Sequence, residues 1–163
     1  MAGQALEHFI GRQVMATHEI SASRHIVAPV HRVYDLIADY RNGHPRILPK
    51  PYFVSLNVEQ GGYGAGTVIN FQMELMGRVQ SFHSTITEPE PGRVLVETDR
   101  NTGAVTTFTV DPRADGQETF VTISTTTNVP AGIFGKIQGW LTTQLLRPIY
   151  VKELEQLAVV ASE

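Results

Sequence analysis

The sequence predicts an α+β protein in which one antiparallel sheet packs against one long helix. Three observations carry this prediction. Short runs of β-branched and aromatic residues recur along the chain, glycine- and proline-rich turns separate them, and the C-terminal segment has the apolar spacing of a helix. The 163 residues fit one domain, which we expect at residues 13–161, with residues 1–12 as an N-terminal arm.

The N-terminal part of this domain predicts a strand followed by two small helices. Residues 14–27 mix apolar and β-branched residues with polar ones, as a strand does. Pro29 suits the first turn of a helix, which should run to about Ala38. The carboxylate of Asp39 can then cap a single turn over residues 40–44, because it can accept free backbone N–H groups.

Six more strands follow at short spacing, separated by turn signals such as Gly61-Gly62 and Asn101-Thr102-Gly103. They are expected at residues 52–59, 66–76, 78–88, 93–99, 104–111 and 118–127. Short connections between successive strands favour antiparallel pairing. The seven strands should therefore form an antiparallel meander.

The long helix begins after Pro130-Ala131-Gly132 and continues to about residue 160. Two adjacent rows of apolar residues mark it, and we expect both to pack on the sheet. The rows are Ile137, Leu141 and Leu145, and Leu146, Tyr150, Leu154 and Leu157. Pro148 should kink the helix. A curved sheet around such a helix leaves a space, which either binds a ligand or is filled by side chains.

Composition restricts the function. The net charge of −3 favours neither nucleic acid nor an anionic membrane, and the absence of cysteine excludes a thiol nucleophile, a disulfide or a thiolate metal site. The histidines lack the i, i+4 spacing of a helical zinc site, so we expect no metal. With neither a signal peptide nor a long apolar segment, we expect a cytoplasmic protein without stable membrane association.

Strand 66–76 indicates what the space would hold. Its residues alternate, with Ile69, Phe71, Met73 and Leu75 on one face and polar residues such as Asn70 on the other. The apolar face should point toward the long helix. A cavity lined in this way would bind a largely apolar ligand with few polar anchors.

Five residues are candidate polar anchors, but none forms a recognisable catalytic motif. They are Tyr34, His83, Glu97, Thr107 and Tyr150. The alternation of apolar residues favours the outer face of the sheet for both His83 and Glu97 without deciding it, and Glu97 is expected to be solvated. The chain has no GxSxG nucleophile motif, so no catalytic residue is assigned.

Several short motifs together resemble the START-like (SRPBCC) superfamily of polyketide cyclase/dehydrase and lipid transport proteins. The matching residues are Ala28-Pro29, Val33-Tyr34, Asp39, Leu48-Pro49, Pro91-Gly92-Arg93 with Leu95, and the leucines Leu154 and Leu157. One departure is Ile47, where many relatives carry tryptophan. The resemblance implies a helix-grip fold, in which seven curved strands wrap around the C-terminal helix and leave a cavity between them.

The resemblance also implies a function and a site. We expect binding or transport of a small hydrophobic or amphipathic ligand, such as a lipid or polyketide, by a monomer or homodimer without cofactor. The implied lining residues are Tyr34, Phe71, Met73, Phe108, Ile123, Trp140, Leu141 and Leu145. Two alternatives stay open. One is a cyclase/dehydrase-type enzyme in which Tyr34, His83 or Glu97 is the acid–base residue, and the other is a module that binds partners through its surface.

Overall fold

The computed structural model describes residues 14–163, so the arm predicted at residues 1–12 lies outside the described residues. The strands are β1 (Met15–Ile26), β2 (Phe53–Gln60), β3 (Val68–Leu75), β4 (Arg78–Glu90), β5 (Val94–Asp99), β6 (Val105–Arg113) and β7 (Glu118–Pro130). The helices are α1 (Val30–Ala38), α2 (His44–Ile47), the single 3-10 turn η1 (Ala114–Gly116) and α3 (Ile133–Ala161).

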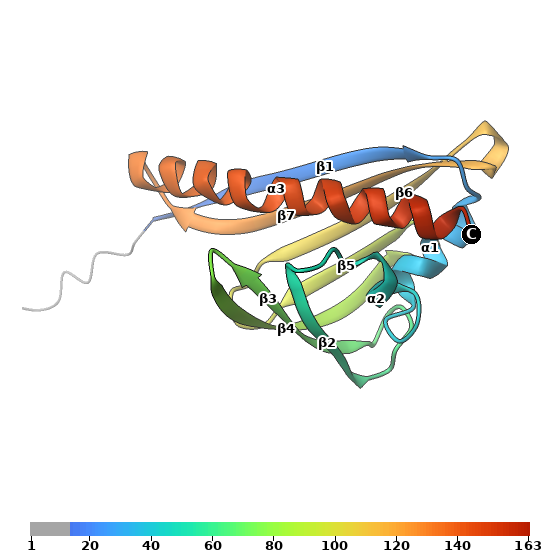
Figure 1. The fold of residues 1–163 in the computed structure, drawn as a ribbon. Coiled ribbons are helices and arrows are strands. Elements are labelled where there is room, and N and C mark those ends of the chain that lie inside the picture. The colour runs from blue at the N-terminus through green and yellow to red at the C-terminus, as the bar shows by residue number, and fades with distance from the viewer. Residues whose placement is uncertain (1–13) are drawn as a thin grey trace, which may run out of the picture.

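The seven strands form one antiparallel sheet in the order β1-β7-β6-β5-β4-β3-β2, which confirms the predicted fold class. Strands β2 to β7 follow one another as hairpins. Strand β1 pairs with β7 along its whole length, from Met15 opposite Pro130 to Ile26 opposite Thr119. The first and last strands of the chain therefore lie side by side, and the sheet curves away from them toward β2 (Figure 1).

Helix α3 runs along β1 and β7, and α1 and α2 lie beside its C-terminal end (Figure 1). It continues through Pro148 as a single helix. The main core lies where α1, α3 and the sheet meet. Its fully buried members include Ile20, Val33, Ile37, Leu95, Val121 and Leu154. The part of α3 nearer its N-terminus lies outside this core and borders a space between the helix and the sheet.

The second small helix lies slightly later in the chain than predicted, at His44–Ile47 instead of residues 40–44. Pro45 explains the difference, because its fixed φ and missing N–H suit the first positions of a helix. Asp39 still has the expected capping role. One of its carboxylate oxygens accepts the backbone N–H groups of Arg41 and Asn42, each at 3.0 Å.

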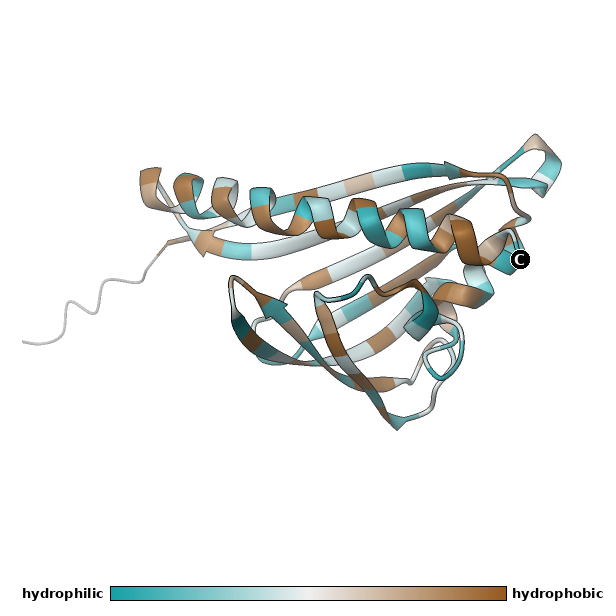
Figure 2. Ribbon diagram, viewed as in Figure 1, coloured by the Kyte–Doolittle hydropathy of each residue, from teal (hydrophilic) through white to brown (hydrophobic). Residues whose placement is uncertain are grey.

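Only one of the two apolar rows of α3 packs on the sheet as predicted. Tyr150, Leu154 and Leu157 of the second row are buried, but Ile137 and Leu141 of the first row are 51% and 55% exposed. Hydrophobic residues accordingly appear on both the inner and the outer side of α3 (Figure 2).

Two glycines explain why Ile137 and Leu141 point outward, while Leu145 at the end of the same row is partly buried. Gly135 and Gly139 are the buried residues of this half of the helix, and they lie one turn apart. A Cβ atom at Gly139 would lie 2.6 Å from Nδ1 of His18, and one at Gly135 would overlap the carbonyl of Pro130. The helix therefore approaches β1 and β7 through its glycine side, which turns the larger apolar side chains away.

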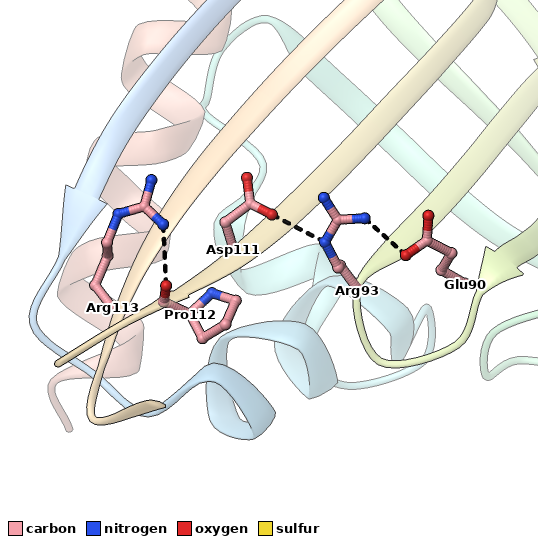
Figure 3. Close-up of polar contacts among 5 residues, drawn as sticks. All are labelled: Glu90, Arg93, Asp111, Pro112 and Arg113. Carbon is pink, nitrogen blue, oxygen red and sulfur yellow. Dashed lines mark hydrogen bonds and ion pairs between the residues drawn. The ribbon is translucent and has the colours of Figure 1, made fainter. Parts of the chain in front are cut away.

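The turn between β4 and β5 is linked to β6 by one arginine. Arg93 donates to Glu90 at 2.6 Å and to Asp111 at 2.9 Å (Figure 3). Both ion pairs lie at the surface, where water screens them and their contribution to stability is small. They join the β4–β5 turn to β6 at the surface of the protein.

Candidate functional site

A cavity of about 460 Å³ lies between the inner face of the sheet and α3. This volume falls within the range of small-molecule sites, which is roughly 300–1,000 Å³. Its walls come from β1, β2, β3, β4, β5, β6, β7 and α3, together with the segment around α2. The predicted space between sheet and helix is therefore present and is not filled by side chains.

One wall of the cavity is aromatic. Phe71 on β3 stacks on Phe82 on β4 with 4.9 Å between ring centroids, and Phe53 on β2 lies 6.1 Å from Phe71. All three line the cavity. The alternation predicted for β3 is confirmed, because Ile69, Phe71, Met73 and Leu75 all face inward. This wall offers flat apolar surface to a ligand.

Five of the eight residues implied by the family resemblance line the cavity, namely Phe71, Met73, Phe108, Ile123 and Leu145. The other three do not. Trp140 is 59% exposed and Leu141 also faces solvent, because the glycine side of α3 points toward the sheet. Tyr34 on α1 is buried in the main core, and its hydroxyl donates to Glu88 of β4.

The inner end of the cavity is polar, and Glu97 on β5 lies there. The expectation that Glu97 is solvated was wrong. Leu95 and Asp99 on the same face of β5 are both buried, so this face points inward even though Val94 and Val96 lie on the other. With apolar residues on both faces, the alternation of this strand could not decide its orientation.

Two aromatic side chains surround Glu97. The hydroxyl of Tyr40 donates to Glu97 at 2.5 Å, and Tyr40 stacks on the imidazole of His44 with 4.6 Å between ring centroids. Nδ1 of His44 lies 2.7 Å from the carbonyl oxygen of Ile37, to which it must donate. Nε2 of His44 is then directed toward Glu97, 3.9 Å away. Burial, followed by the charge of Glu97, raises the pKa of Tyr40 well above its usual range.

A second carboxyl, Glu153 of α3, faces the same end of the cavity and was missed in the sequence. It is 4% exposed, and its side chain makes no hydrogen bond to another group among residues 14–163, so its carboxyl oxygens reach the cavity. Burial, with the nearby charge of Glu97, raises the pKa of Glu153 to about 8. It is therefore protonated at neutral pH. Its position between Tyr150 and Leu154 in an apolar row was the available signal, because a carboxyl there must be buried.

Several other polar groups of the wall are paired with one another. Tyr150 and Thr125 share a hydrogen bond of 2.6 Å, and Thr125 and Thr106 share another of 2.7 Å. Asp99 accepts from Thr102 and from the amide of His83, and these bonds lower its pKa although burial opposes them. Glu153 differs from these groups because it is a carboxyl that lines the cavity without a hydrogen-bond partner among residues 14–163.

The cavity opens near the hairpins at the other end of the sheet. Gln80, Thr102 and Gln138 line it and are also exposed to solvent. His83 and Thr107, two of the candidate anchors, lie elsewhere. His83 points to the outer face, as predicted, and pairs with Glu59 at 2.9 Å. A ligand would therefore pass a polar rim and an aromatic wall before it reached the carboxyls.

Comparison with known proteins agrees with this architecture. A sequence model for polyketide cyclase/dehydrase and lipid transport proteins matches residues 17–162. The chain belongs to this family. No protein with a curated description matches it.

Solved structures show the same fold. The KanY protein (ms6282) is 26% identical, with a TM-score of 0.77 over 91% of this chain and 99% of that one. The ZhuI aromatase/cyclase from Streptomyces sp. R1128 is 15% identical, with a TM-score of 0.69 over 90% and 94% of the two chains. A START superfamily protein from Mycobacterium smegmatis is 11% identical, with a TM-score of 0.69 over 89% and 97%.

No helix within residues 14–163 is both long and apolar enough to cross a membrane. The same residues contain no group of three or more histidine, aspartate or glutamate side chains arranged to hold a metal ion.

Proposed function

We propose that this protein binds a small hydrophobic or amphipathic molecule, such as a lipid or polyketide, in the cavity between the sheet and α3. The observation that carries the proposal is the cavity itself, which is open at one end and has an aromatic wall. Its apolar lining provides the driving force, since burial of apolar ligand surface contributes about 25 cal/mol per Å². The polar inner end suits an amphipathic ligand more than a pure hydrocarbon.

Native mass spectrometry of the purified protein tests the proposal, followed by organic extraction and identification of what is released. We expect a one-to-one complex with a largely apolar species. If the protein is empty and also fails to take up fatty acids, fatty alcohols or apolar dyes, the proposal is wrong. The surface-interaction alternative would then lead.

Two matched substitutions test the location. Phe71→Asp puts a charge into the aromatic wall and should abolish binding, because the cavity cannot solvate it. Leu141→Asp introduces the same side chain on the exposed side of α3 and should leave binding unchanged. The lining residues implied by the family resemblance include Leu141, so on that basis both substitutions should abolish binding. This pair of variants therefore distinguishes the site implied by the resemblance from the cavity of the structure. Equal loss in both variants would contradict the placement of the site.

A cyclase/dehydrase-type enzyme is the second candidate, and one observation favours it. Glu97, a candidate acid–base residue, faces inward beside a second, protonated carboxyl. Two carboxyls that face one ligand cavity are an arrangement suited to acid–base chemistry. If the extracted ligand is converted by the wild type but stays unchanged in Glu97→Gln, the enzyme interpretation holds. Conversion at equal rates by both proteins would exclude Glu97.

A further inference from the structure

The charged groups of the cavity are unusual for a site that binds lipids, because all of its acidic or basic side chains other than His44 are carboxyls. Glu97, Asp99 and Glu153 line it, and the described lining residues include neither lysine nor arginine. A fatty-acid carboxylate would thus meet like charge without a cationic partner. The electrostatics favour a ligand whose polar end is neutral or positive.

Glu153 supplies the second observation. The residue is 4% exposed and lines the cavity, and its side chain makes no hydrogen bond to another group among residues 14–163. No fully buried side-chain oxygen or nitrogen of these residues is unpaired, so the carboxyl oxygens of Glu153 must be accessible from the cavity. A carboxyl at the inner end of an apolar cavity, without a protein partner, can take its hydrogen bonds from a ligand. Glu97 can also accept a hydrogen bond from a ligand, because Tyr40 donates to only one of its two carboxyl oxygens.

An organic ammonium group fits these two carboxyls better than a hydroxyl does. It has up to three donors, and charge-assisted hydrogen bonds are about twice as strong as neutral ones. The apolar body of such a ligand would lie along Phe71 and Phe82.

On the basis of the proposed binding function, we propose that the cavity selects apolar molecules that end in a protonated amine, held between Glu97 and Glu153. The ammonium charge replaces the proton that Glu153 carries in the empty protein. Glu153 then ionises, and amine binding at neutral pH releases a proton to solvent. The other titratable groups at this end, Tyr40, His44 and Tyr150, keep their protein hydrogen bonds.

Isothermal titration calorimetry with three matched probes tests the selectivity: naphthylethylamine, naphthylethanol and naphthylacetic acid. We expect the amine to bind at least about tenfold more tightly than the alcohol, and the acid to bind most weakly. Titration of the amine in two buffers with different ionisation enthalpies should show release of about one proton per amine at pH 7.

Two isosteric variants complete the test. Glu153→Gln should reduce the preference for amine over alcohol to below about threefold and abolish the proton release, with alcohol binding retained as evidence of a folded cavity. Glu155→Gln makes the same substitution on the exposed side of α3. It should leave both the preference for the amine and the proton release unchanged.

The outcomes separate this inference from the proposed function. If the alcohol or the acid binds as tightly as the amine, or if Glu153→Gln keeps the preference, the inference is wrong and the binding function stands. If none of the three probes binds, the inference is also wrong. Extraction of the native ligand then decides independently whether the cavity binds a different class of molecule.

Discussion

The buried carboxyl of Glu153 should make the stability of the empty protein depend on pH in a defined window. Burial and the charge of Glu97 raise its pKa from the ordinary value of 4.5 to about 8. Between these values the unfolded chain has lost the proton while the folded protein retains it. Folding therefore takes up a proton, and the free energy of unfolding contributed by this group falls as the pH rises from 4.5 to 8.

The size of the effect follows from the two pKa values. Each pH unit well inside this interval costs about 1.4 kcal/mol, and the slope is smaller close to each pKa, so the contribution falls by about 3 kcal/mol from pH 5 to pH 8. That is a substantial part of the roughly 5–15 kcal/mol that stabilises a typical domain. The stabilising contribution is fully present below pH 4.5 and is lost by about pH 8.

Urea unfolding of the wild type, Glu153→Gln and Glu155→Gln at several pH values measures the effect. Other groups titrate in all three proteins, so the informative quantity is the difference in unfolding free energy between wild type and Glu153→Gln. We expect the wild type to lose about 3 kcal/mol of unfolding free energy relative to Glu153→Gln between pH 5 and pH 8. The Glu155→Gln difference should stay flat. A flat difference for Glu153→Gln as well would refute the reasoning.

Three further substitutions test the packing around the site, each by its change in unfolding free energy. Gly139→Ala should destabilise the protein by about 1–3 kcal/mol in spite of alanine's better helix propensity, because its Cβ would displace His18; a gain in stability would contradict the close helix–sheet contact. Tyr40→Phe should cost about 1–3 kcal/mol by removing the donor to Glu97, and an unchanged value would mean that water replaces the hydroxyl. Leu95→Ala should cost about 2–5 kcal/mol as a core cavity, and a smaller loss would indicate that β5 can relax.

The sheet and the apolar wall were largely predictable from the sequence, because they rest on local patterns. Strand β3 alternates cleanly, so the inward placement of Phe71 and Met73 followed from period two alone. Turn residues marked most strand ends for the same reason. The start of α2 was misplaced by a few residues, since Asp39 and Pro45 each offer a reasonable beginning.

The polar end of the site was harder to predict because it depends on tertiary contacts. The inward face of β5 is set by the burial of Leu95 against the core, and neither face of that strand is purely polar. The orientation of α3 is set by the close approach of Gly135 and Gly139 to the sheet. The family resemblance placed Trp140 in the cavity by its position and apolar side chain, and neither of these takes the glycine contact into account.

The outward position of Trp140 has a practical consequence for spectroscopy. It is the only tryptophan in the chain, and it lies on the solvent side of α3. Its emission will report the environment of the helix surface and stay nearly constant when the cavity fills. A binding assay based on quenching of the natural tryptophan would therefore show no signal even when ligand is bound. Replacement of Phe82 by tryptophan, together with Trp140→Phe, would move the only indole into the aromatic wall, where ligand contact changes its emission.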